Sequence, residues 1–363
     1  MHKTNTNYSM ETESNENSTG NSSLQSNKRM KRFLIALNCL LLALGDTGGP
    51  LTSRLYFHHG GRRNWLSSFL ETAGFPILLL PLCLNYLRRR RRRSLSTPIF
   101  LITPRLFLAC IGLGLLTGVD DFLYAYGLSF LPVSTAAILL STHLSFTAFF
   151  AFLIVKQRFT FFNINSIALL TTGAALLGLH GSSDRPEGVT DRQYYMGFFL
   201  MIATAALYGL VLPLIELTYR KSQREVTYTL VMEMQLVMAA SATVFCVVGM
   251  AIDKDFQAIP KEAKNFGLGE ARYYVVLTWC AIFWQLFFLG TVGVIFCVNT
   301  LLAAIIVAVF IPVIQILAVI FLHERFSSEK GVALALALWG LASYLYGEHK
   351  QAAKEKPSSI DQP

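Results

Sequence analysis

Long apolar runs alternate with short polar segments along most of this chain. A helix needs about 20 mostly apolar residues to cross a bilayer, and ten runs of that kind follow a polar start. They cover residues 33–56, 66–87, 105–127, 132–155, 161–180, 195–219, 226–251, 272–297, 299–322 and 330–347. The pattern therefore predicts an all-α polytopic membrane protein with ten transmembrane helices.

Composition supports a membrane protein. Hydrophobic residues make up 53% of the 363 residues and charged residues only 15%, against about 25% charged in an average soluble domain. The formal charge of +9 does not indicate nucleic-acid binding, because the basic residues gather in the segments between the apolar runs. The cysteines all fall within apolar runs, without metal-ligand spacing, so we predict neither a metal site nor a disulfide framework.

The distribution of Lys and Arg predicts the orientation, because short cytosolic segments carry an excess of both residues. The segment before the first run, the block at residues 88–93 and the segments after the fourth, sixth and tenth runs are basic. All of them fall on one side if both termini are cytosolic. The opposite side has fewer basic residues, and acids dilute them, so we predict cytosolic termini. The block at 88–93 then serves as an anchor to anionic lipid.

Two segments resemble each other at an offset of 167 residues. Residues 156–160 end the fourth run and residues 323–327 end the ninth, and a run rich in Gly, Ala and Leu follows each. Two halves of five helices have opposite orientations, because five is odd. This is the inverted-repeat plan of secondary transporters, which places the substrate site near the bilayer midplane. Chance similarity of two hydrophobic hairpins is the alternative.

These observations predict an organisation in five parts. They are a disordered cytosolic N-terminal tail (1–31), a first repeat (32–180), an extracytosolic linker (181–194), a second repeat (195–348) and a cytosolic C-terminal tail (349–363). Within the second repeat, apolar residues at positions 256, 259, 263 and 266 recur at helical spacing. They indicate either a short helix on the outer membrane surface or an ordinary loop.

Two adjacent acids, Asp120 and Asp121, lie deep inside the third apolar run. A carboxylate in hydrocarbon costs about 3 kcal/mol or more, so such residues face a protein interior or a water-filled path. Tyr124 lies one helical turn after Asp120 and shares its face. We interpret the acids as a proton or cation site of a transporter. A structural pair that caps or bonds a neighbouring helix is the alternative.

Proton coupling requires a carboxyl group that titrates near the working pH, and burial moves Asp and Glu towards that range. The proton-coupling candidates are Asp120, Asp121, Glu216 and Glu233. The two glutamates lie close to the predicted cytosolic ends of their helices. Pairing with Arg220 or Arg224 is therefore the structural alternative for them.

Several motifs together resemble the plant purine permease family of the drug/metabolite transporter superfamily, from about residue 38 to residue 348. They are Gly45-Asp46-Thr47-Gly48-Gly49-Pro50-Leu51 with Arg54-Leu55-Tyr56-Phe57, Ala73-Gly74-Phe75-Pro76, Leu115-Leu116-Thr117-Gly118-Val119-Asp120-Asp121-Phe122-Leu123-Tyr124, Leu131-Pro132-Val133-Ser134-Thr135, Glu216-Leu217-Thr218-Tyr219, Glu233-Met234-Gln235, Trp284-Gln285-Leu286-Phe287-Phe288-Leu289-Gly290 and Glu329-Lys330-Gly331-Val332.

The resemblance implies a ten-helix carrier in two inverted repeats, placed in the plasma membrane. It implies uptake of adenine, cytokinins or related nitrogenous bases driven by a proton gradient, with the proton as coupling ion and no other cofactor. Some relatives carry alkaloids instead. The chain departs from the family at Asp121, where Asn is usual, and at His143, where Gln is usual. Either change could favour a cationic base or alter proton coupling.

A purine has a flat π face and an edge of alternating donors and acceptors. It needs an aromatic wall and a few polar partners in an otherwise apolar cavity. The substrate-binding candidates are Tyr124, His143, Trp284, Gln285, Asn299 and Gln315. For any single polar member of this set, a hydrogen bond between helices is an equally good explanation.

Four residues of the first run suggest a bent gating helix. Asp46 and Arg54 lie about two turns apart on one face, with Gly49 and Pro50 between them. Proline kinks a helix, and glycine allows close approach of a neighbour or ligand. Close helix packing without gating is the alternative.

Other functional classes lack their signatures. The chain has no Walker A motif, no HExxH motif and no nucleophile elbow, so we predict neither ATP drive nor an enzyme. A nucleotide-sugar or phosphate exchanger would need basic residues inside the spans, where only Arg54 lies. A receptor or scaffold would leave the repeat and the buried acids unexplained. We predict a secondary uptake carrier for a small molecule that works by alternating access in the lipid bilayer, binds no nucleic acid and has an open oligomeric state.

Overall fold

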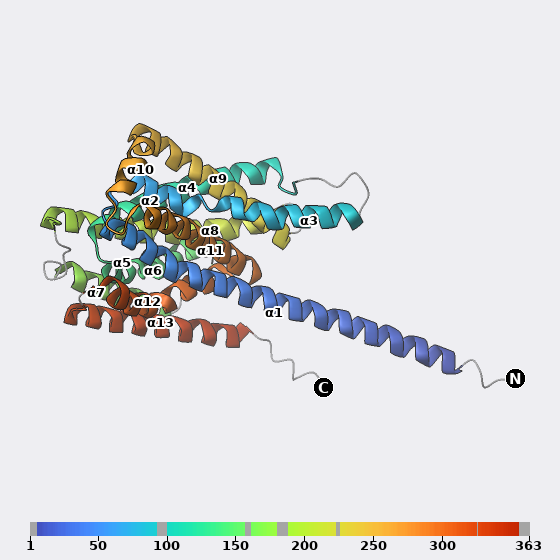
Figure 1. Ribbon diagram of the computed structural model, residues 1–363. Helices are drawn as coiled ribbons and strands as arrows, with labels where there is room; N and C mark the ends of the chain where they lie inside the picture. Colours follow the sequence, from blue (N-terminus) through green and yellow to red (C-terminus); the bar gives the residue numbers. More distant parts are fainter. Residues whose placement is uncertain are drawn as a thin grey trace.

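The computed structural model describes residues 6–92, 100–156, 161–179, 188–222, 226–324 and 326–355. All regular elements among these residues are helices, and they form one bundle (Figure 1). In chain order they are α1 (Thr6–His58), α2 (Asn64–Thr72), the 3₁₀ helix η1 (Phe75–Leu78), α3 (Leu79–Arg92), α4 (Pro104–Phe130), α5 (Val133–Leu140), α6 (His143–Val155), α7 (Phe161–Leu179), α8 (Asp191–Arg220), α9 (Tyr228–Ile252), α10 (Asp255–Lys264), α11 (Glu270–Cys297), α12 (Thr300–Leu322) and α13 (Ser328–Glu355).

The helices confirm the predicted class of all-helical multi-pass membrane protein. Eight segments of the described chain are long and apolar enough to cross a membrane, namely Arg29–His58, Asn64–Arg91, Pro104–Phe130, Val133–Val155, Asp191–Arg220, Tyr228–Ile252, Glu270–Cys297 and Thr300–Leu322. Helices α7 and α13 occupy the positions of the predicted fifth and tenth spans. They pack against each other, and the amide of Asn165 donates to the Ser343 hydroxyl at 2.9 Å. The total of ten spans stays a prediction.

Two predicted spans are broken instead of continuous. The span predicted at 66–87 divides into α2, η1 and α3, because the chain turns at Gly74 and Pro76 removes a backbone donor. The span predicted at 132–155 divides into α5 and α6. At that break the Ser141 hydroxyl donates to Ile138 O at 2.5 Å. Discontinuous helices are typical of the substrate sites of secondary transporters.

Helices α1 and α11 pack closely because glycines line their contact. A Cβ atom added to any of these glycines would come closer than 3 Å to an atom of the other helix. The glycines are Gly45, Gly48 and Gly49 on α1 and Gly290 and Gly293 on α11. Small residues allow such close backbone approach in membrane helix pairs, and here they bring the middle of α1 against the middle of α11.

Helix α10 lies at one end of the bundle, which we call the α10 end, where it connects α9 to α11. Its Glu262 accepts hydrogen bonds from the hydroxyls of Tyr56 at 2.5 Å and Tyr273 at 3.1 Å. Nη1 of Arg63 lies 3.2 Å from Oδ1 of Asp255. Burial raises the pKa of Asp255, and the Arg63 charge opposes that shift. These contacts join α10 to the C-terminal end of α1 and to the N-terminal ends of α2 and α11.

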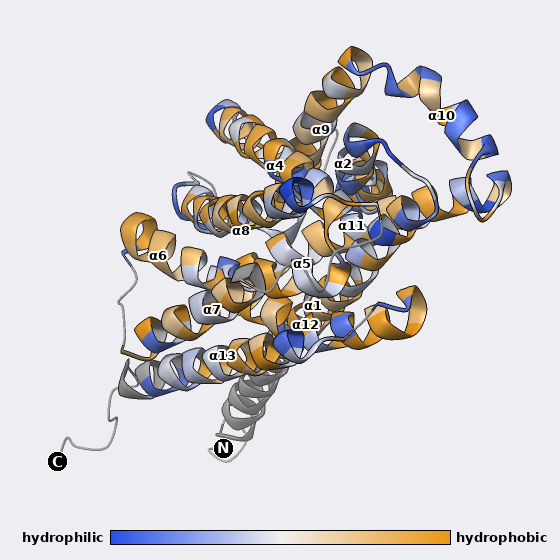
Figure 2. Cartoon of the chain, turned by 90° about the vertical axis from the view of Figure 1, so that its left-hand side faces the viewer, coloured by the Kyte–Doolittle hydropathy of each residue, from blue (hydrophilic) through white to orange (hydrophobic). Residues whose placement is uncertain are grey.

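The helix predicted between positions 256 and 266 is present, but only part of its apolar face is exposed. Phe256 is exposed, whereas Ala263 and the nearby Phe266 are buried against the protein. Figure 2, which is seen from the α10 end, shows apolar residues over most of the bundle and hydrophilic residues on α10 and in the connecting segments. Helix α10 therefore packs on the bundle instead of lying with its whole apolar face on the membrane.

Helix α1 begins and α13 ends on the side of the bundle away from α10 (Figure 1). Helices α6 and α12 end alike. Lys156 and His323 adopt left-handed backbone conformations with φ of 57° and 51°, and their N–H groups donate to carbonyls five residues earlier. These two positions start the segments that the sequence relates at an offset of 167. Residues 157–160 and Arg325 of those segments lie outside the described residues.

Candidate functional site

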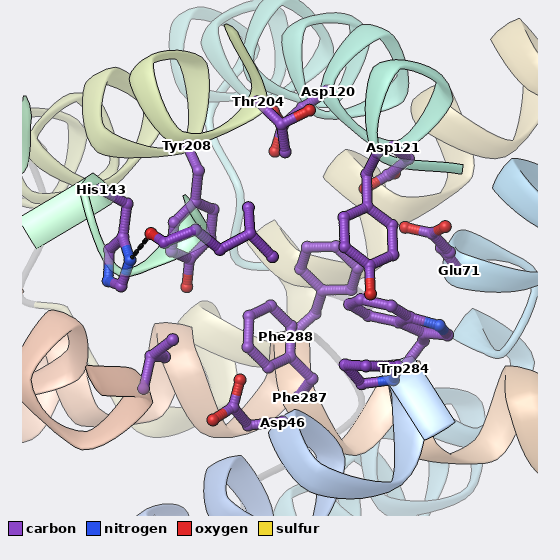
Figure 3. Close-up of a pocket in the computed structure, with 14 residues that line it drawn as sticks. Asp46, Glu71, Asp120, Asp121, His143, Thr204, Tyr208, Trp284, Phe287 and Phe288 are labelled. Carbon is purple, nitrogen blue, oxygen red and sulfur yellow. Dashed lines mark hydrogen bonds between the residues drawn. The ribbon is translucent and has the colours of Figure 1, made fainter. Parts of the chain in front are cut away.

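A cavity lies in the middle of the bundle, beside the breaks between α2 and α3 and between α5 and α6 (Figure 3). Its lining residues surround about 510 Å³ of space free of protein atoms, part of which is open to solvent. It is lined by Asp46, Pro50, Glu71, Asp120, Asp121, Tyr124, Leu140, His143, Thr204, Tyr208, Trp284, Phe287, Phe288 and Val307. Aromatic rings and carboxyl groups thus face one mostly apolar space.

Four acidic side chains line this cavity, namely Asp46 on α1, Glu71 at the end of α2, and Asp120 and Asp121 on α4. All are buried, with exposed fractions between 1% and 7%. Each has one buried carboxylate oxygen without a hydrogen-bond partner among the described residues. The two salt bridges found within those residues involve none of the four. An uncompensated buried charge costs several kcal/mol, so protons or a bound ligand must neutralise part of this charge.

The aromatic wall is centred on Trp284 of α11. Its indole meets the Tyr124 ring edge-on, with the centroids 5.2 Å apart, and the Phe287 ring at 5.4 Å. Its Nε1–H donates to the Ser53 hydroxyl at 3.0 Å. A Cβ atom on Gly49 would lie 2.9 Å from the indole. Helix α1 therefore fixes Trp284 with a hydrogen bond and makes room for the ring with a glycine.

His143 is the first residue of α6, at the break after α5. Its Nδ1 lies 2.6 Å from Leu140 O and its Nε2 lies 3.3 Å from Ala304 O. Carbonyl oxygens only accept hydrogen bonds, so the imidazolium form satisfies both contacts and the neutral form satisfies one. The ring also meets Tyr208 edge-on, with centroids 5.4 Å apart. His143 of α6 thus contacts α5, α8 and α12 at one corner of the cavity.

Two further cavities adjoin the central one. One shares Asp46 and His143 with it and reaches Val133, the first residue of α5. The other shares Asp120 and reaches Ile215, near the end of α8. Val133 belongs to the α10 end and Ile215 to the opposite end. The three cavities therefore form a series along the bundle axis, and an acid lines each junction.

The structure brings many of the predicted site residues together at the cavity. Seven of them line it, from four different helices: Asp46, Pro50, Asp120, Asp121, Tyr124, His143 and Trp284. Gly49 lies directly behind Trp284. Arg54 lies one turn beyond Pro50, and its Nη1 donates to Leu128 O at 3.1 Å, so it joins α1 to α4.

Two predicted proton-coupling acids lie elsewhere, at the ends of helices. Glu216 accepts a hydrogen bond from Nη2 of Arg220 at 2.6 Å and one from the N–H of Thr300 at 3.2 Å. Glu233 accepts hydrogen bonds from the N–H groups of Leu101 and Ile102, at 2.6 and 3.1 Å. Both carboxylates therefore satisfy backbone donors near the start of another helix, and neither lines the cavity.

Three predicted substrate-binding amides also lie outside the cavity lining. Asn299 caps α12, where its Oδ1 accepts from Leu302 N at 2.8 Å. Gln285 and Gln315 are buried, and their amide atoms have no hydrogen-bond partner within the described chain. Gln285 lies beside Gly74 at the break after α2. The two glutamines are thus polar residues of the interior, next to the cavity residues but not among them.

The cavity contains residues that sequence reasoning missed. Glu71 is an acid inside an apolar run, so the criterion that found Asp120 and Asp121 would also have found it. Thr204 and Tyr208 lie on α8. Phe287 and Phe288 belong to a motif that indicated the family but no role for these two rings. Helix α8 is apolar around most of its circumference, and this pattern gives no signal of which face meets a cavity.

The chain is similar to known membrane transporters over nearly its whole length. A family model described as purine nucleobase transmembrane transport matches residues 33–354. Purine permease 3 of Arabidopsis thaliana is 49% identical over 329 residues, which cover 90% of this chain and 94% of that protein. Purine permease 2 of the same organism is 49% identical over 341 residues, with coverages of 90% and 95%. Probable purine permease 5 is 37% identical, with coverages of 90% and 89%.

Proposed function

The chain belongs to the family of purine nucleobase transporters, and we propose that it is a proton-coupled uptake carrier of purine-like bases such as adenine and cytokinins. Its relatives are permeases, which confirms the prediction of a transporter and not an enzyme. The observation that carries the finer proposal is the central cavity, where aromatic rings and four acids without a salt bridge face one space. A flat base fits aromatic walls, and protonatable acids suit a proton-driven carrier.

The substrate is proposed to lie between the two sides of the cavity. Trp284, Tyr124 and Phe288 offer ring surfaces to the π face of the base. Asp46, on α1, offers a carboxylate that accepts hydrogen bonds from the N–H groups along the edge of the base. Thr204 and Tyr208 face the same space from α8 and supply hydroxyls, whose oxygens have no partner within the described residues.

Proton coupling is proposed because the acids outnumber the bases at the cavity. Four carboxyl groups and one imidazole line it, and none of the lining residues is Lys or Arg. Several ionised carboxylates in one apolar space repel one another, and protonation removes that repulsion. A proton that enters with the substrate therefore stabilises the loaded carrier. Its release on the cytosolic side favours substrate release.

Alternating access is proposed to follow from two inverted repeats of five helices, which include α7 and α13. The helix ends support this plan. Helices α4 and α11 end at residues 130 and 297, α7 and α13 begin at residues 161 and 328, and Lys156 and His323 end α6 and α12. Every pair is 167 positions apart. The carrier is placed in the plasma membrane with both termini cytosolic, so the α10 end faces outward.

Alkaloid uptake on the same fold is the second candidate. The four cavity acids favour it, because a cationic nitrogen would meet a carboxylate whichever way the ligand lies. A nucleotide-sugar or phosphate exchanger is disfavoured, because none of the lining residues could meet a phosphate with a permanent positive charge.

The proposal is tested by uptake of radiolabelled adenine in a yeast strain that lacks purine transport, at acidic and at neutral external pH. We expect saturable uptake that is faster at acidic pH and that stops when a protonophore collapses the gradient. Uptake that ignores both pH and protonophore would contradict proton coupling. Normal surface expression without adenine uptake would redirect the substrate assignment to alkaloids, tested with a labelled cationic alkaloid in the same cells.

A further inference from the structure

Glu71 and Asp121 form a carboxyl pair at the edge of the cavity. Glu71 lies in the last turn of α2, and Asp121 lies in α4. Both residues line the cavity, and Figure 3 shows their carboxyl groups near each other. Both side chains are almost fully buried, with exposed fractions of 1% and 3%. One oxygen of each has no hydrogen-bond partner in the described part of the chain.

This arrangement favours one bound proton. Two neighbouring carboxylates buried in an apolar space repel each other when both are ionised, and a proton on one of them removes that repulsion. The titratable groups that face the pair provide no positive charge. They are Asp120 and Tyr124 from α4, Cys246 from α9 and Cys280 from α11. Loss of the proton would therefore leave two like charges face to face without a counter-ion.

The position of Glu71 places this pair beside the break in the second span. The chain breaks two residues after it, at the turn between α2 and η1. At that turn Gly74 packs directly on α11, and an added Cβ atom would lie 2.6 Å from Cβ of Gln285. Gln285 is next to Trp284, the centre of the aromatic wall. A change in the distance between α2 and α4 is thus carried to the substrate side of the cavity through α11.

We propose that Glu71 and Asp121 together bind the coupling proton, one proton shared between two carboxyl groups, while Asp46 on the other side of the cavity binds the substrate. This inference rests on the proposed proton-driven uptake and assigns its proton site. The proton comes from hydronium on the outer side: one O–H bond of hydronium breaks, an O–H bond forms on the carboxyl group, and water is left. On release it passes to water on the cytosolic side, by way of Asp120, which also lines the cavity that reaches Ile215. Repulsion between the two carboxylates then separates α2 from α4.

The test compares two assays on purified protein in liposomes. In the first, an imposed pH gradient, acidic outside, drives accumulation of labelled adenine. In the second, labelled adenine exchanges with unlabelled adenine at equal pH, which needs no net proton transfer. The double variant Glu71→Gln/Asp121→Asn removes the proton site but keeps hydrogen-bonding groups of the same shape. We expect its accumulation to fall to the level without a gradient, while its exchange rate stays within about twofold of wild type.

Two control variants separate this role from general damage. Glu270→Gln makes the same chemical change at an exposed position in the first turn of α11, and we expect wild-type behaviour in both assays. The swapped pair Glu71→Asp/Asp121→Glu keeps both carboxyl groups, and we expect it to retain gradient-driven accumulation. Loss of accumulation in the swapped pair, with exchange intact, would overturn the sharing of one proton.

The outcomes distinguish failure of this inference from failure of the proposed function. If accumulation by wild type does not respond to the gradient, the proposal of proton-driven uptake is wrong, and the role proposed for the pair is rejected with it. If wild type responds and the double variant accumulates adenine equally well, only the pair is overturned. If the double variant loses exchange as well, the single variants decide. Glu71→Gln and Asp121→Asn each leave one carboxyl group without a second one to share the proton. The pH of half-maximal uptake should therefore move about one pH unit towards acid, and an unchanged pH of half-maximal uptake overturns the inference.

Discussion

Two groups of acids in this molecule, all buried except the half-buried Glu324, have the same chemistry and opposite surroundings. Around the central cavity, Asp46 and Asp120 each leave a buried oxygen without a partner in the described chain. Near the ends of helices, Glu233 and Glu324 each accept two backbone N–H groups from another part of the chain. Asp46 and Asp120 face the cavity. Glu233 and Glu324 accept hydrogen bonds from backbone N–H groups at the starts of helices.

The difference teaches that partners, and not residue type or burial, decide what a buried acid does. A carboxylate whose lone pairs accept backbone donors satisfies those donors and stabilises the fold. A carboxylate with free lone pairs beside a cavity can bind a proton or a ligand. Glu324 accepts a hydrogen bond from the first residue of α5 at the α10 end of the bundle. Glu216 accepts one from the first residue of α12 at the opposite end. Acids of the second kind therefore fasten both ends of the bundle.

The largest effect is expected from Asp46→Asn, which removes a cavity charge but keeps the shape of the side chain. A hydrogen bond to a charged group contributes about 2–3 kcal/mol, so kcat/KM for adenine uptake should fall by roughly a hundredfold. Initial uptake rates, normalised to surface expression, measure this. Thermal stability should stay at or above that of wild type, because an unpaired buried charge is lost. A variant with unchanged kcat/KM would remove Asp46 from the substrate site.

The next effect is expected from Glu324→Gln at the α10 end. Glu324 accepts from the N–H groups of Val133 and Ser134 and from the Ser134 hydroxyl, which in turn accepts from the buried ammonium of Lys330 at 2.6 Å. Loss of the negative charge should destabilise the fold by about 2 kcal/mol. A clearly lower Tm of the detergent-solubilised protein, with an unchanged KM, is the expected result. An unchanged Tm would show that this carboxylate does not fasten α5.

A smaller effect is expected from Glu233→Gln. The amide oxygen can still accept from the N–H groups of Leu101 and Ile102, so only the charge contribution is lost, about 1 kcal/mol. Glu233 is buried, as the cavity acids are, which makes it the sharpest test of the comparison. Its pH profile of uptake should match that of wild type. A shifted profile would return Glu233 to the set of coupling acids and weaken the distinction drawn above.

The smallest effect is expected from Asn299→Ala, at the exposed start of α12. The side chain caps Leu302 N, and loss of such a cap costs about 0.5–1 kcal/mol. Uptake of adenine should be unchanged, because the residue does not line the cavity. A small decrease in Tm measured beside Asn299→Ser, which retains a capping oxygen, would confirm the cap. A raised KM would instead restore the residue to the binding site.

Sequence reasoning predicted much of the cavity because polar residues are conspicuous in apolar runs. Asp120 and Asp121 were found in this way, and Asp46 was singled out only as part of a bent gating helix. The positions of Tyr124 and Trp284 followed from motif and helical spacing. Glu71 was missed although the same rule applies to it. The break after Glu71 was also missed, because an apolar run of spanning length conceals a turn at Gly74.

The acids at helix ends show where sequence reasoning stops. Glu233 was a candidate for coupling because it is an acid within an apolar span, and its actual partners, Leu101 and Ile102, are more than a hundred positions away. Glu216 meets Thr300 across a separation of 84 positions. Tertiary packing alone determines such contacts. The pairing of Glu216 with Arg220 was foreseen, because the two residues are one helical turn apart on the same helix.

The glycine contact between α1 and α11 has a consequence for inherited variation. Every other amino acid carries a Cβ atom, so any missense change in these five codons places an atom where the partner helix already lies. The positions are Gly45, Gly48, Gly49, Gly290 and Gly293. Natural alleles should therefore differ at these codons by silent changes only. Leu40 lies on α1 but is exposed at the bundle surface, so this position should vary among apolar residues.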